Sequence, residues 1–330
     1  MLKAWTTMNW YQTAYDHALW VDFQAYGRIL ATDRDRLELM NRISTNKLIN
    51  LPQGVGVATL FLTATARILD YVVVLNQGEQ VLIITQPNRH EAFLNFLRRN
   101  IFWNDRLQLQ DITTSTRHIA LIGKQAQQLL SSWWPEPLPT KRYDFSQHQD
   151  LTLVYSDTIA EAPSYWIIAP ENSMTEVFKW LEQNDVPAAE FSAYDALRIE
   201  AGLPLAGHEL TEDYIPLEIG LWDTISFNKG CYTGQEIIAR MDSRGKLAKM
   251  MVRISTDTTH LTTGQALLNA EGRIVGEITS VAQLPTTPEK FVGLAVVKAT
   301  EALASTQLYT QQGESLNVVG LAGVYESDYL

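Results

Sequence analysis

An eight-residue stretch late in the chain collects the side chains best suited to chemistry. This octet contains the only cysteine of the 330 residues and reads Lys229-Gly230-Cys231-Tyr232-Thr233-Gly234-Gln235-Glu236. Glycine allows positive φ and close approach to a ligand, and a neighbouring cation favours the nucleophilic thiolate. Lys229 and the backbone N–H groups are equally suited to binding an anion. Because an isolated cysteine is commonly a buried and inert hydrophobe, the octet by itself identifies no reaction.

A second group of polar residues precedes the octet. It comprises Arg198-Ile199-Glu200-Ala201-Gly202-Leu203-Pro204, Gly207-His208-Glu209-Leu210 and Pro216-Leu217-Glu218. Gly202 and Pro204 predict the end of a helix, so that one of Arg198 and Glu200 faces a pocket while the other secures the turn. A carboxylate such as Glu200 suits a flat heterocycle with adjacent N–H donors. A solvated Arg–Glu pair at a helix end is the alternative.

Composition limits the class of protein. Hydrophobic residues make up 46% of the chain and aromatic residues 10%, which is ample for a core, and the length suggests two or more domains. We find no apolar run long enough for a signal peptide or membrane helix, so we expect a soluble, cytoplasmic protein without a membrane partner. One cysteine cannot form an internal disulfide or ligate a cluster, and the six histidines lack zinc-motif spacing, so no metal site is expected. The net charge of −11 argues against broad nucleic-acid binding.

Hydrophobic periodicity predicts two related α+β halves. A strand at 81–84 leads through a turn into a helix with apolar residues at 93–97, and the pattern recurs 84 residues later at 165–168 and 177–181. Three prolines within 135–139 exclude a helix or central strand and indicate a connector. Short strands and turns after Gly245 predict a C-terminal β-barrel. The expected domains are 1–130, a connector at 131–150, 151–245 with the octet, and a barrel at 246–330.

These motifs resemble the YgfZ-type folate-binding family, which is related to the T-protein of the glycine cleavage system, an aminomethyltransferase. The resemblance rests on R-x-E-x-G-x-P at 198–204, on Pro216-Leu217-Glu218, on K-G-C-Y-x-G-Q-E at 229–236, and on weaker landmarks at Thr45-Asn46 and Arg67-Ile68-Leu69-Asp70. It implies an α+β fold with two related folate-binding subdomains and a C-terminal β-barrel in a ring-shaped arrangement.

The resemblance also implies a function. Members of the family bind tetrahydrofolate and support the assembly or repair of iron–sulfur enzymes, including those that methylthiolate tRNA. The implied partners are folate and iron–sulfur enzymes or assembly proteins. Glu200 is then expected near the pterin, Lys229 and Cys231 form the activity-linked pair, and the remaining candidates for the cofactor site are Arg198, Tyr194, Tyr232, Gln235 and Glu236.

Three departures distinguish this chain from the related aminomethyltransferases. Ala66 precedes Arg67 where the family carries glycine, so a turn with positive φ is not favoured there. Asp70 is followed by Tyr71 instead of a second aspartate, and Ala206 occupies the place of a tyrosine. We therefore predict that the chain does not transfer an aminomethyl group from a glycine-derived carrier.

Two alternatives remain open, and with them the question of whether the protein is an enzyme. The first is a folate-dependent one-carbon transferase in which Asp70 is the acid–base group. The second is a protein that uses Cys231, tuned by Lys229, as a redox or nucleophilic thiol without folate.

Overall fold

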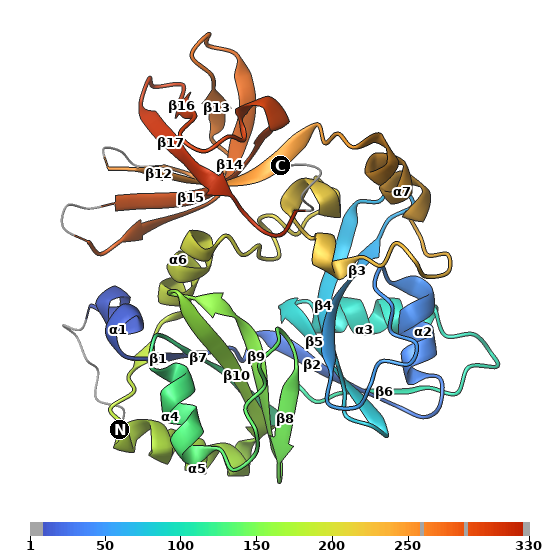
Figure 1. Cartoon of the computed structure of the whole chain (residues 1–330). Helices are drawn as coiled ribbons and strands as arrows, with labels where there is room; N and C mark the ends of the chain where they lie inside the picture. Colours follow the sequence, from blue (N-terminus) through green and yellow to red (C-terminus); the bar gives the residue numbers. More distant parts are fainter. Residues whose placement is uncertain (1–8, 258–260, 287–289, 326–330) are drawn as a thin grey trace. The chain divides into compact units, whose positions relative to one another are not determined.

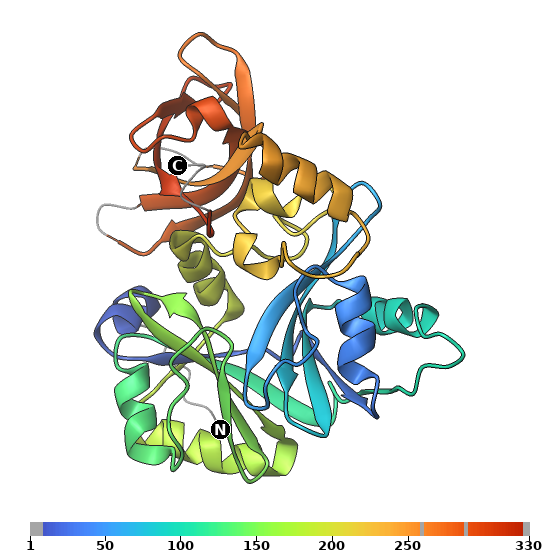
Figure 2. The same ribbon diagram turned by 45° about the vertical axis from the view of Figure 1, so that its right-hand side comes forward.

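The computed structural model describes residues 9–257, 261–286 and 290–325 (Figures 1 and 2). The chain divides into two compact units. The first comprises Met1–Thr59 and Tyr71–Tyr194, and the second comprises Leu60–Asp70 and Asp195–Leu330. The second unit therefore combines a short segment from the N-terminal half with the C-terminal part of the chain.

A five-stranded sheet is formed within the described residues by the order β3-β4-β5-β2-β6. Its strands are β2 (Tyr26–Thr32), β3 (Gly56–Leu62), β4 (Ile68–Asn76), β5 (Gln80–Pro87) and β6 (Gln108–Asp111). Helices α2 (Arg36–Ile43) and α3 (His90–Arg99) accompany it. The buried side of α3 carries Phe93, Leu94 and Leu97, spaced as one face of a helix, and packs on the sheet.

A six-stranded sheet in the first unit has the order β11-β1-β7-β10-β9-β8. Its strands are β1 (Leu19–Asp22), β7 (Thr116–Ile122), β8 (Phe145–His148), β9 (Leu151–Ile159), β10 (Ala162–Pro170) and β11 (Ala188–Ala189). Helices α1 (Trp10–Asp16), α4 (Ala126–Trp133) and α5 (Glu171–Gln183) pack against strands of this sheet. Trp133 of α4 stacks on Trp180 of α5 with ring centroids 4.6 Å apart, which joins the two helices over the core.

The two sheets repeat one topology and confirm the predicted pair of α+β halves. The run β2-α2-β3-β4-β5-α3 corresponds to β7-α4-β8-β9-β10-α5. In the first sheet Ile83 lies between Ile29 and Val74 on the neighbouring strands. In the second sheet the equivalent Ile167 lies between Ile119 and Leu153. The repeat of 84 residues seen in the sequence therefore marks equivalent central strands.

The sheets do not follow the expected boundaries at 130 and 150. Strand β7 and most of α4 precede residue 131, yet they belong to the six-stranded sheet, and β1 joins β7 through pairs such as Trp20↔Leu121. The expected connector 131–150 contains the end of α4 and the edge strand β8. Its proline run does lie outside helices and strands. The difference arises because pairing between β1 and β7 joins residues about a hundred positions apart, which local patterns do not reveal.

The C-terminal strands close into a barrel in the order β12-β15-β14-β13-β16-β17, as predicted. They are β12 (Lys249–Thr256), β13 (Ala266–Leu268), β14 (Ile274–Leu284), β15 (Lys290–Lys298), β16 (Gln307–Tyr309) and β17 (Ser315–Leu321). Residue Leu294 at the centre of β15 is fully buried. Because the barrel is closed, each of these strands pairs with a neighbour on both sides, and the pairing shifts register at a few positions.

The segments between the sheets and the barrel carry the predicted site. They include α6 (Phe191–Ala201), α7 (Gln235–Arg244) and the 3₁₀ turns η1 (Pro216–Ile219) and η2 (Trp222–Thr224), while a third such turn, η3 (Ala299–Glu301), lies in the barrel. In the part of the chain that the structure describes, none of the helices has the length and apolar character needed to cross a membrane.

Candidate functional site

The octet forms a turn that leads into α7. Lys229 is half-buried, and its Nζ lies 5.4 Å from the centre of the Tyr232 ring. Burial lowers the pKa of the Lys229 ammonium to about 8 and raises the pKa of the Tyr232 phenol to about 12. Cys231 lies between them in sequence and is exposed. The turn therefore presents an accessible thiol two residues along the chain from an amine whose pKa is lowered to about 8.

Gly234 holds the octet against a turn from a distant part of the sequence. Its φ is +84°, and an added Cβ would lie 2.9 Å from the Thr63 carbonyl oxygen and 3.0 Å from Ala66 Cα. Only glycine fits this conformation and this separation without displacement. The octet is thus packed against the residues that link β3 to β4, all within the second unit.

The turn at Ala66 differs from the expectation drawn from the sequence. Ala66 has φ +59° and is fully buried, so the left-handed conformation is present although the residue is not glycine. The turn is held by hydrogen bonds from the Ala66 N–H to the Thr63 carbonyl and from the Arg67 N–H to the Thr63 hydroxyl. The Arg67 side chain also donates to the Asp213 carbonyl. These contacts outweigh the cost of the left-handed conformation, about 1–2 kcal/mol for a residue with a Cβ.

Arg198 is part of a buried ionic network. Its guanidinium donates to Glu209 Oε2 and to the Leu203 carbonyl, both at 3.1 Å, and to Ser280 Oγ at 2.8 Å. Ser280 Oγ in turn donates to Glu209 Oε1 at 2.6 Å, and both charged side chains are fully buried. A further ion pair joins Arg198 to Asp195 at 2.8 Å. The N–H groups of the Arg198 guanidinium therefore join the end of α6 to β14. This geometry favours a role for Arg198 in positioning the helix end over direct contact with a ligand.

Glu200 and the remaining candidates occupy different surroundings. Glu200 lies near the C-terminal end of α6 and is half-buried, and Gly202 ends that helix with φ +80°. Gln235 and Glu236 form the first turn of α7, where Gln235 is half-buried and Glu236 is exposed. All three belong to the second unit, as does the octet. Tyr194 belongs to the first unit and packs edge-on against Phe23, with centroids 4.6 Å apart.

Three residues near the site were given no role by the sequence. Glu209 is a fully buried carboxylate, and the nearby Leu205 and Leu210 were the only feature of the sequence that could have indicated its burial. Ser280 lies in a strand 71 residues away from Glu209, so no local pattern links the two. His208 is bonded through Nδ1 to the Thr279 carbonyl at 3.0 Å, which requires the Nδ1–H tautomer and makes it a residue that anchors its turn to β14.

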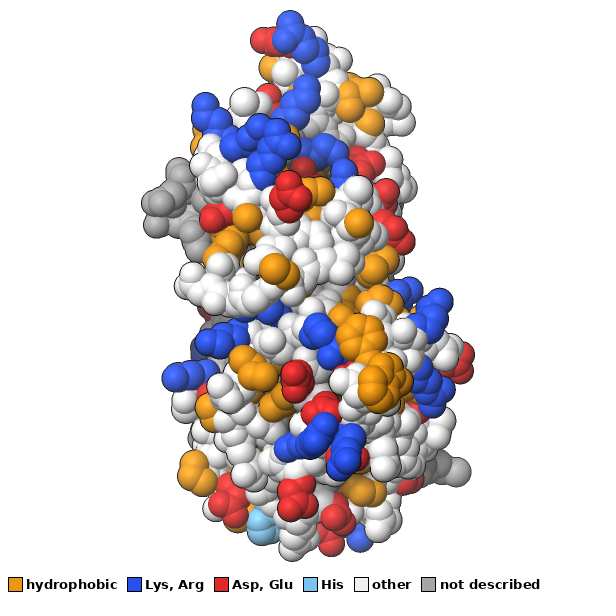
Figure 3. Space-filling model, turned by 90° about the vertical axis from the view of Figure 1, so that its right-hand side faces the viewer, with side chains coloured by type: hydrophobic (Ala, Val, Ile, Leu, Met, Phe, Trp, Pro, Cys, Tyr) orange, Lys and Arg blue, Asp and Glu red, His pale blue; other side chains and the backbone are white. Residues whose placement is uncertain are grey.

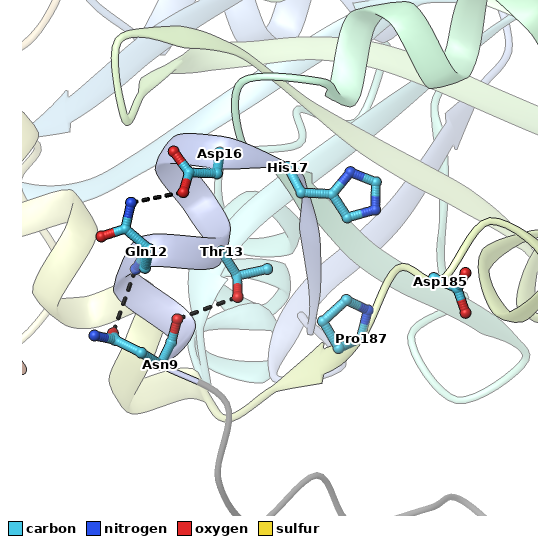
Figure 4. A pocket seen from close by; sticks show the side chains of 7 residues that line it. All are labelled: Asn9, Gln12, Thr13, Asp16, His17, Asp185 and Pro187. Carbon is cyan, nitrogen blue, oxygen red and sulfur yellow. Dashed lines mark hydrogen bonds between the residues drawn. The ribbon is translucent and has the colours of Figure 1, made fainter.

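A surface pocket of about 470 Å³ lies elsewhere, in the first unit (Figure 4). It is lined by Asn9, Gln12, Thr13, Asp16, His17, Asp185 and Pro187. The His17 ring is held by Gln125 at 3.0 Å, and Gln12 donates to Asp16 at 2.6 Å. None of the candidate site residues lines this pocket. Among the described residues, no cluster of three or more His, Cys, Asp or Glu side chains is arranged to hold a metal ion.

Comparison with known proteins gives the family. The GCVT N-terminal domain family matches residues 11–229, which is most of the chain up to the start of the octet. The chain belongs to this family. Its structure is similar to that of the glycine cleavage system aminomethyltransferase T from Bartonella henselae, with a TM-score of 0.82, 19% identity, and coverage of 97% of this chain and 88% of that one. The aminomethyltransferase-like fold, with its mixed sheets and C-terminal barrel, therefore extends over nearly the whole chain.

Relatives by sequence belong to the same class. A putative chloroplastic transferase of Arabidopsis thaliana is 28% identical over 265 residues, which cover 79% of this chain and 61% of that protein. The match thus spans less than two thirds of that relative. An aminomethyltransferase of Shouchella clausii is 25% identical over 299 residues, covering 87% of this chain and 80% of that protein. These relatives support a T-protein-like family member.

Proposed function

We propose that the chain binds tetrahydrofolate and supports the assembly or repair of iron–sulfur enzymes, including those that methylthiolate tRNA. One observation carries the proposal. The chain keeps the aminomethyltransferase fold over 97% of its length, but the residue after Asp70 is Tyr71, whose hydroxyl lies 2.6 Å from that of Tyr143. A buried, hydrogen-bonded phenol occupies the place of a second carboxylate. This substitution favours a binding role over aminomethyl transfer.

The residues of the second unit suit a folate. The half-buried carboxylate of Glu200 can accept hydrogen bonds from the adjacent N–H donors of a pterin ring. Lys229, whose pKa is lowered to about 8, remains mostly protonated at pH 7 and can bind the carboxylate tail. We assign Tyr232, Gln235 and Glu236 to the surroundings of this pair. A bound tetrahydrofolate would supply a carrier for one-carbon groups.

Cys231 is the group that we expect to act in the helper role. Its thiol is exposed and lies two residues from Lys229, so it is accessible to a partner protein. A single thiol cannot ligate a cluster by itself, so the cluster would belong to the partner. Arg198 supports the site by fixing the end of α6. Tyr194, the other candidate on this helix, belongs to the first unit and packs against Phe23.

Calorimetric titration of tetrahydrofolate tests the folate part of the proposal. We expect binding to the wild-type protein, loss of binding in Glu200→Gln, and unchanged binding in Cys231→Ala. The exposed Glu271 of the same unit, in the turn between β13 and β14 of the barrel, provides a matched control, because Glu271→Gln removes the same charge at a position outside the proposed site. Absence of binding to the wild-type protein would overturn the folate assignment and favour the thiol alternative.

The iron–sulfur part needs a cellular test. In cells that lack the protein, we expect reduced activity of iron–sulfur enzymes and reduced methylthiolation of tRNA, both restored by the wild-type gene and not by Cys231→Ala. Unchanged enzyme activity and unchanged tRNA modification in the deletion strain would refute this part while leaving folate binding intact.

A one-carbon transferase is the second candidate, and the position of Asp70 favours it. This carboxylate is 8% exposed and belongs to the same unit as Glu200. Buried carboxyl groups are suited to acid–base catalysis. The transferase predicts folate-dependent turnover of a small amine or protein-bound substrate that Asp70→Asn abolishes. Folate binding without turnover would exclude it.

A further inference from the structure

A fully exposed tryptophan stands in the loop between α3 and β6 of the first unit. Trp103 is 99% exposed and its neighbour Phe102 is 57% exposed. The loop runs outward at the right of Figure 1, and on the face shown in Figure 3 hydrophobic side chains lie beside those of Lys and Arg. Single exposed aliphatic residues are ordinary on protein surfaces, but an indole and a phenyl ring together leave a large apolar area in water.

The turn that carries Trp103 is braced on both sides. Asp105 Oδ2 accepts hydrogen bonds from the Phe102 N–H and from Arg42 Nη2, both at 2.7 Å. The Arg42 guanidinium lies over the Phe102 ring, with its central carbon 4.3 Å from the centroid. Beyond the turn, the Arg106 N–H donates to Asp35 at 2.7 Å. The exposed indole is therefore presented by a fixed backbone, which lowers the entropy lost on binding.

Cations surround this turn in a chain that is acidic overall. Arg98, Arg99 and Arg106 are exposed within five residues of Trp103. The acid nearest in sequence, Asp105, stays ionised because its hydrogen bonds from Arg42 and the Phe102 N–H hold its pKa below the ordinary value, and its charge is balanced by the ion pair with Arg42 at 2.7 Å. We name Arg98, Arg99, Phe102, Trp103 and Arg106 the aromatic–arginine patch. Its free charge is positive, so its partner is expected to be anionic.

We propose that the aromatic–arginine patch binds single-stranded RNA, with an unpaired base stacked on Trp103 and the arginines against the adjoining phosphates. Base stacking on an aromatic side chain next to a basic surface is the general mode of single-strand binding. RNA is favoured because its loops present unpaired, splayed bases, whereas a four-residue turn offers no helix or ribbon to enter the major groove of DNA. The apolar area is confined to two rings, which suits one or two bases better than the broad apolar centre of a protein interface.

This inference concerns a different unit from the proposed folate site and does not depend on it. It is compatible with the acidic net charge, which argues against broad nucleic-acid binding but not against one local patch. If the protein supports tRNA-modifying enzymes, a contact with RNA would bring it close to the tRNA on which those enzymes act.

Fluorescence anisotropy with a labelled 12-nucleotide RNA of unpaired sequence tests the proposal at low and at physiological salt. We expect Trp103→Ala to weaken binding by about tenfold, which is about 1.4 kcal/mol, because the variant loses the stacking of one base. The Arg98→Gln, Arg99→Gln double variant should reduce the slope of log K against log salt by about 1.4, since each phosphate contact on a single strand contributes about 0.7. Trp103→Phe should restore most of the affinity lost in Trp103→Ala.

Matched controls lie on the barrel. Leu303 is 70% exposed and Arg273 is an exposed arginine, so Leu303→Ala and Arg273→Gln change similar surface without touching the patch, and neither should alter binding. Because Trp103 is exposed, its substitution should not alter the melting temperature. Absence of RNA binding at low salt, or equal loss in the control variants, would overturn the proposal. Polyglutamate that competes as well as RNA would indicate an acidic protein partner instead, and equal binding of single-stranded DNA would remove the preference for RNA.

Discussion

Replacing Gly234 with alanine tests whether the octet is held in place by close packing on the distant turn at 63–66. Gly234 at the start of α7 and Gly245 at its end both have positive φ, of +84° and +59°. A Cβ in this conformation costs about 1–2 kcal/mol at either position. Only at Gly234 does it also meet backbone, at 2.9 Å from the Thr63 oxygen, whereas nothing lies within 4 Å of the equivalent atom at Gly245. Overpacking of this kind adds about 1–3 kcal/mol.

Hydrogen exchange measured by mass spectrometry separates the two contributions. We expect Gly234→Ala to lower the free energy of opening by about 2–5 kcal/mol and Gly245→Ala by about 1–2 kcal/mol. Both variants should increase exchange in the peptide covering α7, but only Gly234→Ala should increase it at 63–70, because only that methyl pushes the two segments apart. Equal effects of the two substitutions at 63–70 would refute the packing argument. Tryptophan fluorescence is less suited, since, among the tryptophans that the structure describes, only Trp222 lies in the second unit.

Three further predictions address buried and titrating groups. Arg198→Met should lower the free energy of unfolding, measured by urea titration, by about 3–5 kcal/mol, because it leaves the buried Glu209 carboxylate without its arginine partner. Adding Glu209→Met should recover part of the loss. A double variant no more stable than Arg198→Met would contradict the ion-pair argument. His118 is fully buried, and burial lowers the pKa of its imidazole. Below about pH 6.5 the unfolded chain therefore binds one more proton at this residue than the folded chain does, and the free energy of unfolding falls by up to about 1.4 kcal/mol per pH unit on acidification. This pH dependence of stability should be absent in His118→Leu. The affinity for tetrahydrofolate should fall as pH rises through about 8, where Lys229 loses its charge. Lys229→Met should remove this pH dependence of binding, and the control Lys246→Met, at an exposed position, should keep it. A pH dependence that persists in Lys229→Met would point to another group.

Local sequence patterns predicted those parts of the fold that depend on neighbouring residues. The run 81–84 and its copy at 165–168 became the central strands β5 and β10, because strands buried on both sides need continuous apolar residues. The alternation of short strands and turns after Gly245 became the closed barrel. Gly202 ended α6 with positive φ, as its position before Pro204 indicated.

Predictions that required long-range contacts were incomplete. Residue Ala66 adopts the left-handed conformation because hydrogen bonds within its own turn and the packing of Gly234 hold it there, although its side chain disfavours that region. For Arg198 the sequence left two roles open, facing the ligand or securing the helix end, because its partners Glu209 and Ser280 come from a turn and a barrel strand that only folding brings together. Their positions in sequence carry no signal of that network.

The amino-acid sequence already defines which reactive groups this protein has: one thiol near a lysine in a glycine-bounded turn, a carboxylate at a helix end, an acidic net charge, and the apolar periods of two α+β halves and a barrel. The environment of those groups comes from the fold. It lowered the pKa of Lys229 by desolvation, exposed Cys231, committed Arg198 to a buried ion pair, and placed the turn at 63–66 against Gly234. The physical reason is that burial and pairing depend on which distant segments meet, and the free energy of a charged group depends on those surroundings more than on its neighbours along the chain.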